Sequence, residues 1–399
     1  MLAAAARELK LPLLVQTPSA DDPASRLASD VIRADVRDVE GTRRLAQRCS
    51  AITFENEWVD LPGLAALAAQ GVTFVPSLPA LEPLVCKRSQ RELLRRLNLP
   101  SPAWLPLTDL LESADPVQHN RRTGDPPVPH AAAPATGAAL PTLPPRWQFP
   151  LMAKAASGGY DGKGTALLRD RDDLEALLER VDPEHWIVET LVAFEQELSQ
   201  LVCRDRAGRV LCYPLVRTHQ HQRVCDWVLA PAPVPHAVQA YARNIATSLL
   251  TALDYVGVLS IEFFYGPCGL LVNEIAPRTH NSGHVTIEAA HTSQFAQQAR
   301  IVAGLPMGSV ELKVPGALMV NLLGFEHSDD DGDGYRAERT ALAALPGATV
   351  HWYGKRGARP GRKLGHITLL LDGPGPAALE EQARQRLAAV RALWPLPSA

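Results

Sequence analysis

The segment SIEFFYGPCGLLVNEIAPRTHNSGH, residues 260–284, decides the fold. Two apolar runs flank a Gly-Pro-Cys-Gly turn, a pattern that predicts a β-hairpin. If residues 267–269 form a three-residue loop with Gly269 in the left-handed conformation, Glu262 lies opposite Glu274 and both side chains share one face. A four-residue loop would shift the register by one residue and place the two glutamates on opposite faces.

The three-residue loop predicts a metal site. Two carboxylates that face each other across a strand pair repel, and a divalent cation between them removes the conflict. Oxygen ligands that leave part of the coordination sphere open suit Mg²⁺, which keeps waters and bridges to nucleotide phosphates. Glu262 and Glu274 are therefore the predicted ligands of Mg²⁺.

The polar residues directly after this hairpin predict an anion pocket. The chain turns at Pro277 and presents Arg278, His280, Asn281 and Ser282. An arginine, an imidazole, an amide and a hydroxyl supply the charge and the hydrogen-bond donors that a small oxyanion needs. The segment therefore predicts an anion site beside a nucleotide metal.

Upstream, the glycine-rich stretch KAASGGYDGKG, residues 154–164, joins two apolar segments. Such a loop can point several backbone N–H groups at a phosphate. It is not a Walker A loop, because Gly164 stands where that motif requires a hydroxyl. Lys154, at the end of the preceding strand, is placed to reach a nucleotide phosphate. The alternative is a flexible hairpin turn in which Tyr160 and Asp161 have no functional role.

Two further segments carry weaker signals. The backbone of Glu189, Thr190, Leu191 and Val192, followed by Glu197, is compatible with adenine and ribose binding, although glutamates at strand ends are commonly solvated. The stretch HWYGKRGARPGRKLGH, residues 351–366, gathers five basic side chains between turns. It predicts capture of a phosphate monoester by guanidinium groups, with a solvated surface loop as the alternative.

Composition excludes several other classes of function. The chain has 399 residues, 46% of them apolar, and a formal net charge of −3, which indicates two or three domains without bulk attraction to nucleic acid. Its six cysteines form no C-x-x-C pair, and they are expected to be reduced thiols. With no apolar run of membrane-spanning length and no signal-peptide pattern, the expected location is the cytoplasm.

The order of predicted elements suggests three domains. Alternating helical and strand-like segments predict an N-terminal doubly wound α/β domain over residues 1–85. Residues 86–308 form the next predicted domain, interrupted at about 112–147 by an insertion rich in Pro, Ala and Gly. Residues 309–399 form a small C-terminal domain with a last helix near 377–394.

Three motifs together resemble one known family. They are NEIAPRTHNSGHVTIEAAHTSQFAQQARIVAGLP (273–306), SGGYDGKG (157–164) and HWYGKRGARPGRK (351–363). They strongly resemble 5-(carboxyamino)imidazole ribonucleotide synthetases of purine biosynthesis, which belong to the ATP-grasp superfamily. The resemblance runs from residue 1 to about the last helix, outside the insertion. It implies a mixed α/β and α+β chain with an ATP-grasp fold, and an ATP-dependent, ADP-forming carbon–nitrogen ligase.

The resemblance also implies a reaction and the roles of individual residues. ATP, bicarbonate and 5-aminoimidazole ribonucleotide would give ADP, phosphate and the N-carboxylated ribonucleotide through carboxyphosphate. By similarity, the metal ligands are Glu262 and Glu274; the ATP-binding residues are Lys87, Lys154, Glu189, Thr190, Leu191, Val192 and Glu197; the carboxyphosphate pocket is Arg278, His280, Asn281 and Ser282; and the ribonucleotide-binding residues are Tyr160, Asp161, Lys163, Lys355 and Arg362, with Asp161 also catalytic.

One departure from the family concerns the start of the chain. The family begins with a strand and the pattern GGGQLGRM, whereas this chain begins at the final methionine of that pattern. The first strand of the doubly wound domain is therefore expected to be missing, and a misplaced start is the favoured explanation. A homodimer is expected by resemblance. Two other readings stay open: a formate-using ligase of the same pathway, and a nucleotide-binding protein without turnover.

Overall fold

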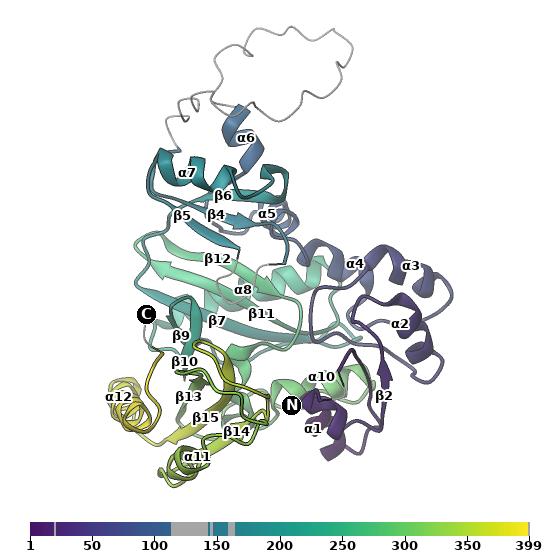
Figure 1. The fold of residues 1–399 in the computed structure, drawn as a ribbon, viewed down its shortest axis with the longest axis vertical. Helices are drawn as coiled ribbons and strands as arrows, with labels where there is room; N and C mark the ends of the chain where they lie inside the picture. Colours follow the sequence, from purple (N-terminus) through teal and green to yellow (C-terminus); the bar gives the residue numbers. More distant parts are fainter. Residues whose placement is uncertain (20, 113–142, 144–146, 159–163, 398–399) are drawn as a thin grey trace, which may run out of the picture.

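The computed structural model describes residues 1–19, 21–112, 143, 147–158 and 164–397 (Figure 1). The predicted insertion at about 112–147 lies almost entirely outside the described residues, as do Tyr160, Asp161 and Lys163. The described residues form a two-stranded, a four-stranded and a nine-stranded sheet. None of the described helices is long and apolar enough to span a bilayer.

The N-terminal part is a small α/β unit around a parallel strand pair. Strands β1 and β2 pair in parallel, and further along the chain Ile52 and Phe74 form a parallel bridge. Asp38 and Asp60 cap helices α2 and α3 by accepting backbone N–H groups, so each helix begins directly after an acidic residue. The elements are α1 (Leu2–Glu8), β1 (Leu14–Thr17), β2 (Asp30–Arg33), α2 (Val39–Ala46), α3 (Leu61–Ala69) and α4 (Leu78–Leu81), with 3₁₀ turns at Pro23–Arg26 and Glu82–Leu84.

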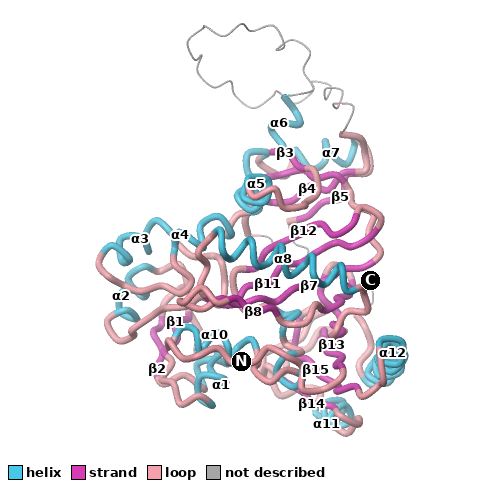
Figure 2. Tube along the Cα trace, turned by 180° about the vertical axis from the view of Figure 1, so that it is seen from behind, coloured by secondary structure: helices cyan, strands magenta, loops and turns pink. Residues whose placement is uncertain are grey.

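The next part is a four-stranded antiparallel sheet in the order β3-β6-β4-β5. Figure 2 shows it above β12, at one end of the large sheet. Strands β4 and β5 are the two predicted strands on either side of the glycine-rich loop. The elements are α5 (Lys87–Arg96), β3 (Trp104–Pro106), α6 (Leu107–Glu112), β4 (Leu151–Ala155), β5 (Thr165–Leu168), α7 (Arg171–Leu178), a 3₁₀ turn at Pro183–His185 and β6 (Trp186–Thr190).

The large sheet has the order β12-β11-β7-β9-β10-β13-β15-β14, and β8 pairs with β7 outside this path. Its last three strands come from the C-terminal part, so the sheet continues across the predicted boundary near residue 309. The domain ranges 1–85, 86–308 and 309–399 stay a prediction. The strands are β7 (Gln196–Arg204), β8 (Val210–Cys212), β9 (Val216–His221), β10 (Val224–Ala230), β11 (Gly257–Gly266), β12 (Gly269–Ala276), β13 (Gly316–Leu323), β14 (Ala348–Trp352) and β15 (Lys363–Leu371).

The helices around the large sheet cover apolar side chains. Helix α8 packs Ile245 and Leu249 against Leu198, Leu259 and residues near them on one face of the sheet. At the C-terminal end, α12 packs on β13 and β15. The helices are α8 (His236–Ala252), α9 (Thr286–Ala289), α10 (Gln294–Val302), α11 (Arg336–Ala343) and α12 (Pro376–Leu393), with a 3₁₀ turn at Asn281–Gly283.

Strand alternation leaves a polar strip on the sheet face opposite α8. Because Leu198 on β7 and Ile261 on β11 face the core under α8, their neighbours Ser199 and Glu262 point to the other side. The same parity sends Glu197 and Ser260 to that face. The fold thus sets the predicted metal ligand Glu262 on a polar face.

Candidate active site

Glu262 and Glu274 are directly paired across β11 and β12, as predicted, but the predicted loop was wrong. Gly266 pairs with Gly269, so the loop has two residues, and a register shift follows between Glu262 and Phe263. Gly269 does adopt the predicted left-handed conformation, with φ +79°. A two-residue loop alone would set Asn273 opposite Glu262. One extra residue in β12 restores the pairing of the glutamates.

This extra residue is a β-bulge at Asn273 that changes which side chains face the core. Leu270 and Val272 pack in the core under α8, and so does Ile275. With uninterrupted alternation Glu274 would share the face of Val272. The bulge instead gives the core position to Ile275 and turns Glu274 toward the face of Glu262.

Helix α5 holds the bulge from the open edge of the sheet. The amide of Gln90 donates to the carbonyl of Ile275 at 2.8 Å and accepts its N–H at 3.1 Å, as a neighbouring strand would. The guanidinium of Arg91 donates to the carbonyl oxygens of Val272 at 3.4 Å and Asn273 at 2.6 Å. Gln90 and Arg91 were not predicted as site residues, because their importance depends on contacts about 180 residues away in the chain.

Arg91 also belongs to a buried ion cluster that orients Lys154. Arg91 Nε lies 2.6 Å from Glu189 Oε1, and Lys154 Nζ lies 2.8 Å from Glu189 Oε2. Lys154 additionally donates to Asn273 Oδ1 at 3.0 Å. The Glu189 side chain is only 2% exposed, so it is committed to these cations. Its backbone lies between β3 and β4, opposite Trp104 and Met152. Lys154 is therefore held beside the bulge.

The pKa values of Glu189 and Lys154 are both lowered. For Glu189 this favours the charged form, and for Lys154 it favours the neutral form. Burial opposes ionisation of Glu189, but the charges of Arg91 and Lys154 outweigh it and hold the pKa of Glu189 below its usual value. Burial lowers the pKa of Lys154, and the carboxylate of Glu189 counteracts this. Since each buried charge depends on the others, we expect the loss of one member to disturb all three.

The facing glutamates form a region of concentrated negative charge. Burial and the nearby carboxylates of Glu274 and Glu197 raise the pKa of Glu262 to about 7. Burial also acts on Glu274, but Lys87, whose Nζ lies 2.5 Å from Glu274 Oε1, lowers its pKa. Burial raises the pKa of Glu197. A divalent cation bound by Glu262 and Glu274 would relieve this repulsion, so the donor set fits Mg²⁺. Among the described residues, no group of three or more His, Cys, Asp or Glu side chains is arranged to hold a metal ion by itself.

The predicted adenine segment, residues 189–192, spans the last two residues of β6 and the two residues after it. Thr190 donates its N–H to the carbonyl of Ala103 at 3.0 Å, and the side chain of Leu191 is exposed. Close by in the chain, the rings of Phe194 and Phe264 stack with centroids 4.6 Å apart. Phe194 is exposed as well, and this apolar stack beside Glu197 was not predicted from the sequence.

The predicted anion segment begins with an arginine tied to the N-terminal part of the chain. Arg278 makes a two-pronged ion pair with Glu57, with Nε 2.6 Å from Oε2 and Nη2 3.3 Å from Oε1. Glu55 also lies close to Arg278: burial raises the pKa of Glu55, and the charges of the N-terminus and Arg278 lower it in part. Arg278, which the sequence assigned to an anion pocket, is thus held by a residue that precedes β12 by more than 200 positions.

The other residues of this segment have defined partners. Burial and the charges of Arg278 and Lys363 lower the pKa of His280 to about 3, so its imidazole is neutral. His280 Nε2 lies 3.6 Å from Glu262 Oε1. The amides of Asn281 and Asn321 exchange two hydrogen bonds, of 3.0 and 2.7 Å. Ser282 is buried, and its hydroxyl lies 3.0 Å from His280 Nδ1. Of these residues, His280 lies beside a predicted metal ligand.

The predicted phosphate-binding residues lie in the loop between β14 and β15. Lys355 Nζ donates to the carbonyl of Lys363 at 2.9 Å, and Arg362 donates to the carbonyl of Gly357 at 2.7 Å. Both side chains therefore brace their own loop. The charge of Lys363, at the start of β15, lowers the pKa of both Glu262 and His280. The sequence placed Lys363 in the basic stretch but did not assign it to the site.

The glycine-rich loop is described only at its two ends. Gly158 and Gly164 both have positive φ, +78° and +77°, which glycine adopts without strain. Ala155 donates its N–H to the carbonyl of Gly164 at 2.7 Å, which closes the base of the loop. The predictions for Tyr160, Asp161 and Lys163 lie outside the described residues.

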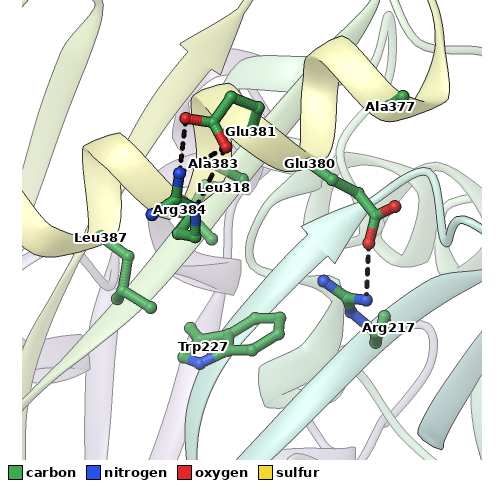
Figure 3. A pocket seen from close by; sticks show the side chains of 9 residues that line it. All are labelled: Arg217, Trp227, Leu318, Ala377, Glu380, Glu381, Ala383, Arg384 and Leu387. Atoms are coloured by element: carbon green, nitrogen blue, oxygen red, sulfur yellow. Dashed lines mark hydrogen bonds and ion pairs between the residues drawn. The ribbon is translucent and has the colours of Figure 1, made fainter.

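A separate hollow of about 410 Å³ lies between α12 and the large sheet (Figure 3). Trp227 and Leu318 contribute apolar surface, and the charged side chains at its rim pair with one another. Arg217 binds Glu380 at 2.9 Å, and Arg384 binds Glu381 within the same helix. None of the predicted site residues lines this hollow.

Comparison with known proteins agrees with this architecture. Three family models match the chain: a ribonucleotide synthetase preATP-grasp domain at residues 1–84, an ATP-grasp domain at 125–295 and a phosphoribosylaminoimidazole carboxylase C-terminal domain at 317–378. The fold and the site thus define an ATP-grasp enzyme, an ATP-dependent ligase that forms ADP.

Individual relatives specify the family further. The N5-carboxyaminoimidazole ribonucleotide synthase of Synechococcus elongatus is 46% identical over 397 residues, which cover 100% of this chain and 93% of the relative. The crystal structure of the corresponding synthetase from Thermus thermophilus has a TM-score of 0.80 and 32% identity, covering 100% of this chain and 97% of that one. The Aspergillus clavatus enzyme, solved with ADP and 5-aminoimidazole ribonucleotide, has a TM-score of 0.77 and 27% identity, with coverage of 98% and 95%. This chain belongs to the N5-carboxyaminoimidazole ribonucleotide synthase family.

Proposed function

We propose that this protein carboxylates 5-aminoimidazole ribonucleotide with bicarbonate, at the expense of ATP, in purine biosynthesis. ATP phosphorylates bicarbonate to carboxyphosphate, and the exocyclic amine of the ribonucleotide then takes up the carbon dioxide that carboxyphosphate carries. ADP, phosphate and the N-carboxylated ribonucleotide are the products. The observation that carries the proposal is the facing pair Glu262 and Glu274, followed directly by the segment from Arg278 to Ser282.

ATP is proposed to bind between the four-stranded and the nine-stranded sheet. Lys87 and Lys154 would contact its phosphates, the backbone of residues 189–192 its adenine, and Glu197 its ribose. The burial of Lys154 between Glu189 and Asn273 supports this assignment, because a fixed ammonium loses little conformational entropy when it meets a phosphate. Mg²⁺ would be held by Glu262 and Glu274, where it would neutralise phosphate charge.

Bicarbonate and carboxyphosphate are proposed to bind beside Arg278 and His280. Arg278 is oriented by its two-pronged contact with Glu57. A neutral His280 can donate one hydrogen bond to an oxyanion without adding a proton to it. The proposed pocket also includes Asn281 and Ser282, whose side chains fix the shape of the turn through Asn321 and His280.

The ribonucleotide is proposed to bind at Tyr160, Asp161, Lys163, Lys355 and Arg362, with Asp161 taking part in the reaction at its amine. The support is the family resemblance and the basic loop that places Lys363 near Glu262. A homodimer in the cytoplasm, with no nucleic-acid partner, completes the proposal. These points rest on the resemblance and on the near-neutral net charge of −3.

Product assays test the proposed function directly. The purified protein is mixed with ATP, Mg²⁺, bicarbonate and 5-aminoimidazole ribonucleotide, and the formation of ADP is measured with each component omitted in turn. We expect ADP only when all four are present. ADP formation with formate in place of bicarbonate would favour the formate-using ligase, and ATP binding without turnover would favour a nucleotide-binding protein.

A further inference from the structure

Three buried serine hydroxyls form a chain that ends at His280. Ser199 Oγ lies 2.7 Å from Ser282 Oγ and 3.0 Å from Ser260 Oγ, while Ser260 and Ser282 are 3.4 Å apart. Ser282 Oγ in turn lies 3.0 Å from His280 Nδ1. Ser199 and Ser260 are 0% exposed and come from β7 and β11, the strands that carry Glu197 and Glu262. The hydroxyls thus lie beside Glu262, which pairs with Ser199 across β11 and β7.

One backbone hydrogen bond determines which serine hydroxyl donates and which accepts. The N–H of Ser282 donates to His280 Nδ1 at 3.4 Å, as in a capped helical turn. Nδ1 must therefore carry a lone pair and no proton, so the ring is neutral and its proton is on Nε2. The Ser282 hydroxyl consequently donates to Nδ1 and is left to accept a hydrogen bond. Ser199 is the nearest donor to it, and Ser260 can donate to Ser199.

The backbone of His280 is also fixed, which limits where its ring can lie. Gln294 accepts the N–H of His280 at 2.9 Å and donates to its carbonyl at 2.7 Å. Nε2, the nitrogen that carries the proton, is the one that lies 3.6 Å from Glu262 Oε1. The protein therefore presents an N–H donor, rather than a lone pair, to the space beside Glu262.

We propose that Ser199, acting through Ser282, is a positioning residue that keeps His280 in the Nε2–H tautomer, so that His280 donates a hydrogen bond to an oxygen of the bicarbonate-derived group. This inference rests on the proposed function. Ser260 supports Ser199 from β11. These hydrogen bonds give each of the three buried serine hydroxyls the partner that a buried polar group needs.

Substitution of Ser199 with a tautomer readout tests the proposal. Histidine labelled with ¹⁵N distinguishes a protonated ring nitrogen from an unprotonated one, and His280→Gln identifies the signals of His280. We expect wild type to show an unprotonated Nδ1. Ser199→Ala should show a mixture of tautomers, because the Ser282 hydroxyl is then free to turn and accept from a protonated Nδ1, and only the long 3.4 Å backbone contact opposes that tautomer. We also expect about a 10-fold fall in kcat for ADP formation with little change in the KM for ATP, because a donor that is present in only part of the molecules stabilises the reacting oxyanion less well.

Thr368→Val is the matched control, because Thr368 is 0% exposed on β15 and its hydroxyl has no hydrogen-bond partner within the described residues. It should leave the tautomer and kcat unchanged. If Ser199→Ala does not fold, Ser260→Ala carries the same test with a smaller effect of the same sign. Unchanged ring signals in a folded serine variant overturn the proposal, whatever its kcat. A wild type that shows the expected tautomer but forms no ADP overturns the proposed function instead.

Discussion

Glu262 and Glu274 face each other across β11 and β12 because one extra residue interrupts their strand pairing. The bulge leaves Asn273 without a partner residue on β11. Gln90, Arg91 and Lys154 form hydrogen bonds with the backbone or the side chain at this point. The two carboxylates then share one face with the polar strip of the sheet, while Ile275 fills the core. A structural irregularity therefore creates the proposed metal site.

Removing one of these carboxylates should stop the reaction and preserve the fold. Glu274→Gln keeps the size of the side chain but weakens Mg²⁺ binding, and we expect turnover to fall about 100-fold or more, equivalent to about 3 kcal/mol. ADP formation and the thermal unfolding midpoint are measured together. Glu311→Gln, at an exposed position, is the control. Wild-type turnover in Glu274→Gln would refute the metal assignment.

Arg91 should be important for stability. Arg91→Met removes the cation from a buried pair with Glu189 and leaves two bulge carbonyls without their donor. We expect a loss of about 3 kcal/mol in the free energy of unfolding, because the buried carboxylate of Glu189 then has only Lys154 to compensate its charge. Chemical denaturation measures the loss. Arg96→Met, at an exposed position of the same helix, should change stability by less than about 0.5 kcal/mol. Equal effects of the two substitutions would contradict the role of Arg91.

The Glu189 carboxylate predicts a specific pH dependence of stability. Its pKa in the folded protein lies below the ordinary value of 4.5 because of Arg91 and Lys154. The folded state therefore binds this proton less readily than the unfolded state, so the stabilisation is present above about pH 4.5 and is lost as the pH falls through the folded pKa. Unfolding midpoints of wild type and Glu189→Gln should differ at pH 7 and converge in acid. A pH-independent difference would argue against an ionised Glu189.

Glu57 should orient Arg278 for the proposed bicarbonate site. Glu57→Gln keeps one hydrogen bond and removes the charge partner, and we expect the KM for bicarbonate to rise about 5-fold, equivalent to about 1 kcal/mol. The KM for ATP should stay nearly constant. A double-mutant cycle with Arg278→Lys checks the mechanism, since additive effects would show that the two residues act independently.

Much of the fold was readable from local patterns. The apolar runs around the glycine loop became β4 and β5, and the last helix predicted near 377–394 became α12. The β9–β10 hairpin was missed, because polar residues such as His219 and His221 interrupt its apolar pattern. The site was predicted at Glu262, Glu274 and the segment after them, but not at Gln90, Arg91 or Ser199. Those three side chains are ordinary in their own segments and acquire a role only through distant partners.

The sequence by itself determined the hairpin, the two acidic residues on it, the glycine-rich loop and the polar turn from Arg278 to Ser282, because each is written in residues that are close along the chain. Only the tertiary structure decided the bulge at Asn273, the burial of Glu189 between two cations and the contact of Arg278 with Glu57. Local periodicity specifies which face a strand residue takes while pairing stays regular. An inserted residue reverses that face, and here the contacts around it are made by α5 and β4, which lie far away in sequence.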